Sequence, residues 1–334
     1  MREFLVTVVI PTLAADENLL ACLSSLDRQT FGDFEVIVVD NSAQGLVGRL
    51  HVAAKVLEEK SNAGFGAAIN HAAAASRSRY LATINDDAVA HPGWLGSLVE
   101  AMESRPAAGM CASQVRLFGS DLLDSAAMVI AADGSSKQRG HLQPTGAYAS
   151  GGEALLPSGS AAIYRRSAFE EAGGFDEDFF LYCEDTDLGL RLRRAGWTCL
   201  YAPDAVVEHG YSRSAGRASP LKAYLVERNR LFTILKNYPA RDLIVALLAS
   251  VARYFWHVAY LTQGTGKAAE FLSGGNPGWK LAIYVFRAHL AALASLPTLM
   301  AKRTAIRRSA KLRPSEFRAL LRAHSIPLRL VAEL

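Results

Sequence analysis

Cysteine is scarce in this chain, and the few cysteines that occur are far apart. Cys22, Cys111, Cys183 and Cys199 are the only four among 334 residues, and no two of them form a C-x-x-C pair. Disulfide frameworks and structural zinc sites both depend on closely spaced or regularly spaced cysteines. The sequence therefore indicates neither, and it fits a reducing cytosolic compartment.

Glycine is missing from the first predicted turn between a strand and a helix. A strand rich in β-branched residues over 5–10 ends at Pro11, and residues 11–17 read PTLAADE before a helix predicted over 18–29 with Asp16 as its cap. Dinucleotide-binding loops and P-loops need glycine at this turn so that phosphate can approach the backbone. The absence excludes both kinds of loop.

Long uncharged apolar runs are also lacking. Apolar helices predicted over 243–261 and 279–300 are interrupted by Arg, Lys or His, so that their uncharged runs fall short of the ~18 residues that a spanning helix needs. The apolar segment at the N-terminus is too short for a signal peptide, which predicts that the protein works where it is made. Nothing in the sequence therefore predicts a segment that crosses a membrane.

Charge is unevenly distributed along the chain. The formal net charge is +4, but the residues from Lys302 onward carry nine Lys and Arg against two Glu. A near-neutral body with a basic tail favours an anionic partner surface, either a membrane or a nucleic acid. We expect the two apolar helices and this tail to lie on the inner face of the cell membrane; packing against the rest of the protein or a second subunit is the alternative.

Strands and helices alternate through the first ~120 residues. Strands are predicted over 35–40, 80–84 and 109–117, and helices over 64–75 and 93–103. This alternation predicts an α/β fold with a mostly parallel sheet and helices on both faces. Residues 120–158 are predicted to form irregular loops and short strands over the sheet. A strand over 160–165, helices over 167–172 and 184–195, and short strands over 198–201 and 205–208 are predicted to follow. We expect one domain over 1–239 and a helical, basic region over 240–334.

Carboxylates follow two of the buried strands. Asp40 ends one strand, and Asn85, Asp86 and Asp87 follow another. Ligands of parallel sheets bind beyond the carboxyl ends of the strands, and carboxylates suit Mg²⁺ or Mn²⁺. The competing interpretation is that these are turn-forming residues.

Three carboxylates lie together in residues 179–191, FFLYCEDTDLGLR. Glu184, Asp185 and Asp187 follow an aromatic, apolar run at the predicted start of a helix. An apolar lead-in predicts that at least one of them is half-buried at the mouth of a cleft, which is the environment that a general base needs. A helix cap made of solvated acids is the alternative.

Two further segments carry candidate ligands. Residues 62–70, NAGFGAAIN, place glycines at a helix start where a ligand can approach the backbone, or where the chain simply turns. His209 follows a β-branched run and is a candidate metal ligand or a structural residue. Some of the cations in the next segment are candidates to bind a diphosphate, and a solvated face is the alternative for most of them: Arg213, Arg217, Lys222, Arg228 and Arg230.

Taken in order, five segments resemble the inverting nucleotide-sugar glycosyltransferases of family 2, which have the GT-A fold. They are residues 8–12, 35–41, 62–70, 85–87 and 173–197. The last segment, GGFDEDFFLYCEDTDLGLRLRRAGW, is the most specific. Its sequence is closest to bacterial rhamnosyltransferase-like members that build cell-surface polysaccharides.

The resemblance implies a role for each candidate residue. Asp185 corresponds to the catalytic base, with Glu184 beside it, and a divalent cation, Mn²⁺ or Mg²⁺, would bind Asp87 and His209. Asp40 would read the base of the nucleotide, and Asp86 would lie on the ribose side. The donor-binding residues implied are Pro11, Thr12, Asp40, Asn62, Gly64, Phe65, Asn70 and Asp86.

The function implied is metal-dependent transfer of a sugar, with inversion, from a nucleoside-diphosphate donor. Rhamnose from dTDP-rhamnose is the leading donor, a UDP-hexose is the alternative, and the acceptor is a saccharide or a polyprenyl-linked sugar; no nucleic acid is expected as partner. A nucleotidyltransferase and a catalytically silent membrane-surface protein are the rival interpretations. The chain departs from the family pattern at residues 13–15 and 42–45, and Asn85 replaces the first acid of the usual metal-binding motif.

Overall fold

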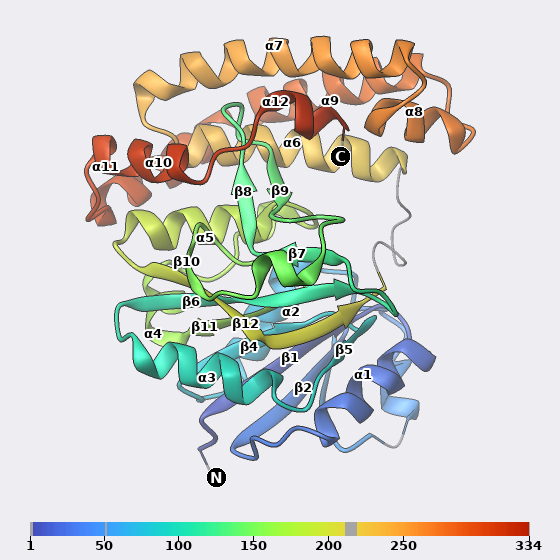
Figure 1. Ribbon diagram of the computed structural model, residues 1–334, viewed down its shortest axis with the longest axis vertical. Coiled ribbons are helices and arrows are strands. Elements are labelled where there is room, and N and C mark those ends of the chain that lie inside the picture. Colours follow the sequence, from blue (N-terminus) through green and yellow to red (C-terminus); the bar gives the residue numbers. More distant parts are fainter. Residues whose placement is uncertain (1–2, 51, 211–218, 334) are drawn as a thin grey trace. The chain divides into compact units, whose positions relative to one another are not determined.

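The computed structural model describes residues 3–50, 52–210 and 219–333, and these divide into two compact units (Figure 1). Unit 1 contains the described residues of 1–128 and 138–211. Unit 2 contains residues 129–137 and the described residues of 212–334.

Unit 1 is built on a ten-stranded sheet. Its main path runs β10-β12-β6-β11-β4-β1-β2-β3, with β5 paired to β12 and β7 paired to β6. The strands are β1 (Val6–Thr12), β2 (Phe34–Asp40), β3 (Lys55–Glu58), β4 (Tyr80–Ile84), β5 (Ala88–Ala90), β6 (Ala108–Leu117), β7 (Leu123–Ala126), β10 (Gly152–Ala154), β11 (Ala161–Arg165) and β12 (Thr198–His209). Strands β3, β2, β1, β4, β6 and β12 run in one direction, and β11 runs against them between β4 and β6. The predicted mostly parallel sheet is confirmed.

Helices cover both faces of this sheet. They are α1 (Glu17–Asp27), α2 (Phe65–Ala74), α3 (Trp94–Ser104), α4 (Arg166–Glu171) and α5 (Glu184–Arg194), with short 3₁₀ turns η1 (Val47–Arg49), η2 (Thr145–Tyr148) and η3 (Glu177–Phe179). Alternate residues of β1, namely Val6, Val8 and Ile10, pack in one core with residues of α1 and α3. Because side chains alternate along a strand, the intervening residues point to the opposite face, where α2 packs.

The local signals placed most elements of unit 1 within two residues. Asp16 caps α1 as expected, because its Oδ1 accepts hydrogen bonds from the amides of Asn18 and Leu19. The two short strands predicted over 198–201 and 205–208 are instead one strand, β12, with an irregularity between Ala202 and Val206. Pairing with the long neighbour β6 carries the strand through that irregularity.

Unit 2 consists of helices and the turn of a hairpin. The hairpin strands are β8 (Met128–Ile130) and β9 (Ser136–Gln138), and the helices are α6 (Pro220–Asn237), α7 (Ala240–Thr262), α8 (Gly266–Ser273), α9 (Trp279–Ala294), α10 (Leu296–Ser309), α11 (Pro314–Ala323) and α12 (Leu328–Glu333). Helix α6, which the predicted boundary at residue 239 leaves in the first domain, packs on α9 and α10, while α7 packs on α8 and α12. The single helix predicted over 279–300 is wrong: the chain breaks at Ser295, because Pro297 is tolerated only in the first turn of a new helix, α10.

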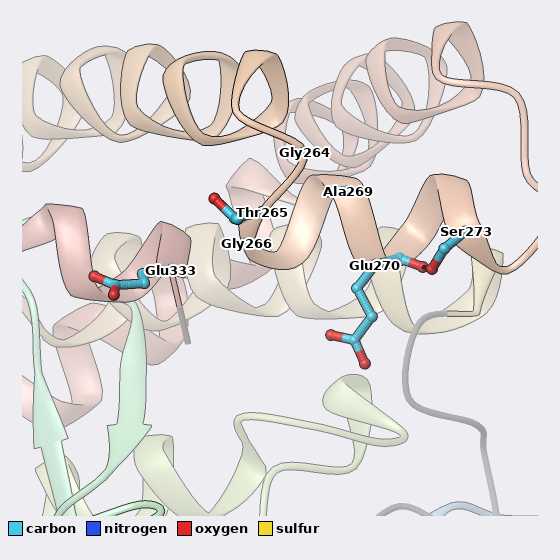
Figure 2. Close-up of a pocket in the computed structure, with 7 residues that line it drawn as sticks. All are labelled: Gly264, Thr265, Gly266, Ala269, Glu270, Ser273 and Glu333. Atoms are coloured by element: carbon cyan, nitrogen blue, oxygen red, sulfur yellow. Dashed lines mark hydrogen bonds between the residues drawn. The ribbon is translucent and has the colours of Figure 1, made fainter.

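A shallow hollow of ≈ 380 Å³ in unit 2 is lined by Gly264, Thr265, Gly266, Ala269, Glu270, Ser273 and Glu333 (Figure 2). Both of its carboxylates already have partners. Glu270 pairs with Lys267 at 3.0 Å, and Glu333 accepts a hydrogen bond from the Tyr260 hydroxyl at 2.9 Å. The hollow contains none of the residues that the sequence predicted for the site, which belong to unit 1.

Candidate active site

Helix α5 begins with the acidic pair Glu184 and Asp185, directly after an unusual stretch of backbone. Phe180, Tyr182 and Cys183 all adopt positive φ angles of 63–70°. A non-glycine residue in this region costs free energy, and such residues cluster at functional sites. The surrounding structure therefore holds the start of α5 in one particular orientation.

The two carboxylates of this pair lie in different surroundings. Asp185 is half-buried: its Oδ2 accepts a hydrogen bond from the Gly159 amide at 2.9 Å, and its Oδ1 accepts one from the Thr186 amide at 2.6 Å. Burial raises the pKa of Asp185, although these hydrogen bonds oppose the shift. Glu184 is only 6% exposed, and burial together with the charge of Asp185 raises its pKa. Asp185 is thus the more accessible of the two.

Asp86 follows β4, and β1 fixes its orientation. The Thr12 hydroxyl at the end of β1 lies 2.6 Å from Asp86 Oδ2. Burial raises the pKa of Asp86, and the charge of Asp87 adds to this, while the Thr12 hydrogen bond works in the other direction. The neighbouring strands β1 and β4 therefore position this carboxylate at the carboxyl edge of the sheet, where the sequence predicted Asp86 to lie.

Asp87 meets His209 at the end of β12. His209 Nε2 lies 3.2 Å from Asp87 Oδ1, and Nδ1 lies 3.0 Å from Asp124 Oδ2 on β7. Burial lowers the pKa of His209, but the two carboxylates outweigh burial and raise it to about 9. The structure therefore brings together the two residues predicted to bind a metal and adds Asp124, which the sequence reasoning missed.

Two adjoining strand ends connect the Asp185 cluster to the Asp86–Asp87 cluster. The Gly159 amide, which binds Asp185, precedes β11, and β11 pairs with β4 so that Ala161 lies opposite Ile84. The next residue, Ser160, accepts a hydrogen bond from the Asn85 amide at 2.9 Å. One continuous segment of backbone thus joins the candidate base to the candidate metal-binding acids.

The Asp87 and His209 pair fits a divalent cation that takes only part of its coordination from the protein. Adjacent ligands of an octahedral ion with bonds of about 2.1 Å lie about 3 Å apart, and these two atoms are 3.2 Å apart. Within residues 3–50, 52–210 and 219–333, no group of three or more His, Cys, Asp or Glu side chains is arranged to hold a metal. Substrate phosphates and water would have to supply the remaining ligands.

Asp40 organises the loop that follows β2. Its side chain is buried, Oδ1 accepts hydrogen bonds from the Ser42 amide and hydroxyl, and Oδ2 accepts one from the Val47 amide at 2.8 Å. Burial raises the pKa of Asp40, but these hydrogen bonds outweigh it and leave the pKa below its usual range. Its predicted contact with a nucleotide base stays a prediction, because three donors from its own loop already occupy this carboxylate.

The glycine-rich segment over 62–70 packs against the chain that leads into α5. Gly64 has a φ of 90°, and a Cβ at this position would come within 2.3 Å of the Phe180 carbonyl oxygen. That oxygen accepts a hydrogen bond from the Phe65 amide at 2.8 Å, and Asn62 accepts one from the Gly64 amide at 3.0 Å. The close approach that requires glycine here is an approach of backbone to backbone.

Asn70 and Asn41 fasten these loops to one another. Asn70 bonds both the amide and the carbonyl of Phe175 at 2.9 Å, so it holds the segment before α5 against α2. Asn41 is buried and bonds the Ala63 amide and the Gly64 carbonyl. Both side chains therefore act on loop geometry; the predicted donor contacts of Asn62, Gly64, Phe65 and Asn70 stay predictions.

Other residues singled out from the sequence lie in the sheet, in unit 2 or outside the described residues. Pro11 pairs with Val39 in the sheet, and its predicted contact with the donor stays a prediction. Arg230 belongs to unit 2, where it is buried against Glu227, and Lys222 and Arg228 belong to unit 2 as well. Arg213 and Arg217 lie outside the described residues.

Sequence reasoning missed Gly159, Asp124 and Asn41. Gly159 lies in a Ser-Gly-Ser segment and Asp124 in a region of weak periodicity, so neither carried a local signal. A local signal could have identified Asn41, because it directly follows a buried strand that ends in Asp40. Long-range packing alone brings Asp124 to His209, which is 85 positions further along the chain.

Comparison with known proteins identifies the family. The model of "Glycosyl transferase family 2" matches residues 7–173. An N-acetylglucosaminyl-diphospho-decaprenol L-rhamnosyltransferase of Mycobacterium tuberculosis is 32% identical over 249 residues, which are 65% of this chain and 80% of that protein. Rhamnosyltransferase WbbL of Escherichia coli K12 is 40% identical over 67 residues, 20% of this chain and 25% of that protein.

Solved structures confirm the fold. GalNAc-T7 with UDP, GalNAc and Mn²⁺ aligns with a TM-score of 0.56 and 14% identity over 72% of this chain and 49% of that chain. The mannosyltransferase PcManGT from Pyrobaculum calidifontis, in complex with GDP-Man and Mn²⁺, aligns with a TM-score of 0.52 and 17% identity over 88% and 87%. The fold is therefore the GT-A fold that the sequence predicted. The protein is a rhamnosyltransferase-like glycosyltransferase, and the chain belongs to glycosyl transferase family 2.

Proposed function

We propose that this glycosyltransferase moves a hexose from a nucleoside-diphosphate donor to an acceptor hydroxyl with inversion, and that the donor is dTDP-rhamnose. The observation that carries the proposal is the placement of Asp185, half-buried at the start of α5 and joined through Gly159 to the strand ends that hold Asp86 and Asp87. This placement supports a base and a phosphate-binding edge close to one another in unit 1.

Asp185 is the base of this proposal. The acceptor oxygen forms a bond to the anomeric carbon, the bond from that carbon to the diphosphate oxygen breaks, and the proton of the acceptor hydroxyl passes to Asp185. A carboxylate whose pKa is raised by burial is a better proton acceptor than a solvated one. Hydrogen bonds from Gly159 and Thr186 hold the carboxylate in one orientation, and Glu184 lies behind it in the interior.

Asp87 and His209 would hold the divalent cation, Mn²⁺ or Mg²⁺. Such an ion supplies positive charge for the departing diphosphate. Asp124 accepts a hydrogen bond from Nδ1 of His209 and so fixes the orientation of the imidazole, as carboxylates behind metal-binding histidines do. The Mn²⁺ in the two similar structures supports this part of the proposal.

The names of the relatives support the choice of substrates. The Mycobacterium tuberculosis protein is named for rhamnose transfer to N-acetylglucosaminyl-diphospho-decaprenol, and WbbL is named a rhamnosyltransferase. We therefore propose a polyprenyl-diphosphate-linked sugar as acceptor and a role in building a cell-surface polysaccharide. A UDP-hexose is the alternative donor.

Turnover of defined donors tests the proposal. The full chain is assayed with dTDP-rhamnose and with UDP-hexoses, using a polyprenyl-diphosphate-linked N-acetylglucosamine as acceptor, with Mn²⁺ or with EDTA. Asp185→Asn keeps the shape of the side chain and removes the proton acceptor, so transfer should fall by a factor of about 10² to 10⁴ while donor binding persists. Asp204→Asn removes an exposed carboxylate on β12 and is the matched control. Transfer by Asp185→Asn at the rate of the unmodified chain would disprove the base assignment.

A further inference from the structure

Helix α7 has two faces of opposite character. With 23 residues, this helix is long and apolar enough to cross a membrane by length and composition alone. The sequence had predicted that its uncharged runs were too short for that. One face is a stripe of large apolar side chains, each 59–68% exposed, at the spacing of a single helix face. The α7 stripe consists of Ile244, Leu248, Val251, Phe255 and Val258.

Helix α9 repeats this pattern in the same unit. Its outer residues recur at the same intervals of four and three and are 42–65% exposed. The α9 stripe consists of Trp279, Ile283, Phe286, Leu290 and Leu293. Exposed apolar stripes of this kind are rare on soluble monomers and mark a contact with a membrane or with another protein.

The opposite face of α7 is fastened to its own unit by buried charges. Arg253 is 7% exposed, its Nε donates to Asp133 Oδ2 at 2.5 Å, and its Nη2 donates to Glu227 Oε2 at 2.6 Å. A helix that crossed the bilayer would have to release these bonds and place an arginine in the hydrocarbon. The ion pairs therefore favour a helix that lies along the membrane surface.

Charge in this part of the chain identifies the partner. Residues 271–315 contain eight Lys and Arg and no Asp or Glu. Among them Arg287, Arg307, Arg308 and Lys311 are exposed, and the exposed Arg313 is paired with Glu316. A second copy of the chain would bring the same positive charge to the contact, whereas an anionic lipid surface attracts both the cations and the apolar stripes.

We propose that unit 2 docks on an anionic lipid bilayer through the α7 stripe and the α9 stripe, with α7 lying in the plane of the interface. The stripes enter the boundary between headgroups and acyl chains, and the exposed cations pair with lipid phosphates. This inference does not depend on which sugar the enzyme transfers, because it concerns the surface on which the protein sits.

Flotation of the purified full chain with preformed vesicles tests the proposal. Vesicles of phosphatidylcholine alone are compared with vesicles that also contain phosphatidylglycerol, at low and at high salt. The protein should float with the anionic vesicles and should float less in high salt, since salt screens the charges. Failure to float with anionic vesicles at low salt would overturn the proposal.

Surface variants separate the two parts of the contact. Leu248→Glu with Phe255→Glu places charges on the α7 stripe without touching the core and should weaken binding by roughly tenfold or more; Leu20→Glu, at an apolar α1 position that is 46% exposed, is the matched control. Arg307→Gln with Arg308→Gln should also weaken binding roughly tenfold, and Arg28→Gln with Arg77→Gln, at exposed positions of unit 1, should not. Unchanged flotation of the Leu248 and Phe255 variant would overturn the proposal.

Two further measurements test the alternatives to surface docking, which are a contact with a second copy of the chain and a membrane-spanning α7. Sedimentation without lipid should show a monomer; a stable dimer abolished by the α7 substitutions would assign the stripe to a second copy. Protein bound to dense vesicles should move to light vesicles when these are added. Protein that stays with the dense vesicles would indicate that α7 spans the bilayer.

Discussion

Removal of the Arg253 side chain should destabilise unit 2 because it unbalances a buried cluster of four charges. Arg230 and Arg253 face Asp133 and Glu227, and each of these side chains is at most 9% exposed. Burial raises the pKa of Glu227, but Arg230 and Arg253 outweigh burial and hold it far below its usual range. In the Arg253→Met variant two buried carboxylates share one cation.

The expected cost follows from the loss of one partner of a buried ion pair, about 3 to 5 kcal/mol. The sign of its pH dependence follows from Glu227. Because the folded pKa of Glu227 is depressed, its contribution is present above its unfolded pKa of about 4.5 and is lost as pH falls toward the folded value. The penalty of Arg253→Met should therefore be full at neutral pH and should shrink in acid, where the unpaired carboxylate can take up a proton.

Hydrogen exchange followed by mass spectrometry reads this cost locally. Amides of α6 and α7 that exchange by opening of unit 2 should exchange roughly two to four orders of magnitude faster in Arg253→Met. Arg241→Met, at an exposed position near the start of α7, is the control and should change little. Adding Glu227→Gln to Arg253→Met restores a neutral cluster and should recover part of the protection. The reasoning is refuted if the amides of Arg253→Met exchange at the rate of the unmodified chain. It is also refuted if adding Glu227→Gln to Arg253→Met speeds exchange further instead of slowing it.

Three further predictions concern the site in unit 1. Asp124→Asn should weaken Mn²⁺ binding, measured by calorimetry in the presence of dTDP, by roughly 10- to 100-fold; the exposed Asp121→Asn should not, and equal affinities would show that Asp124 does not act through His209. Asp87→Ala should remove the metal-dependent part of donor affinity and His209→Ala should lower it less, so equal donor affinity in EDTA and in Mn²⁺ would contradict the metal site. The unmodified chain should bind UDP or dTDP at least about tenfold more tightly than CDP, and Asp40→Ala should remove this preference. An unmodified chain that binds all three equally would rule out base reading by Asp40. A variant that only loses its fold would show that Asp40 acts through its loop contacts.

The sequence by itself determined the architecture of unit 1 because local signals there agree with one another. Buried strands such as β4 are read from runs of apolar and β-branched residues, and α1 from Asp16 and the periodicity that follows it. Acids at the ends of buried strands and at the start of α5 marked Asp86, Asp87 and Asp185, because ligands of parallel sheets bind at the carboxyl edge.

The tertiary structure alone decided how these residues are held. Asp124 joins His209, and Gly159 joins Asp185, through contacts between segments that are 85 and 26 positions apart. No local periodicity reports such contacts, because they arise from the order of strands in the sheet. Gly64 is a further example, because only the tertiary structure shows that the Phe180 backbone leaves no room for a side chain there. From the sequence alone, this glycine is equally typical of a loop that binds a ligand.

In unit 2 the sequence predicted apolar helices, and the packing decided which face of each helix is buried. Hydrophobicity predicted apolar helices, but it cannot distinguish a face that packs inward from one that remains exposed. The ion pairs of Arg253 with Asp133 and Glu227, residues from a hairpin turn and from α6, fix which side of α7 faces inward. The α7 stripe is exposed as a consequence, because the helical period places its residues on the face opposite Arg253.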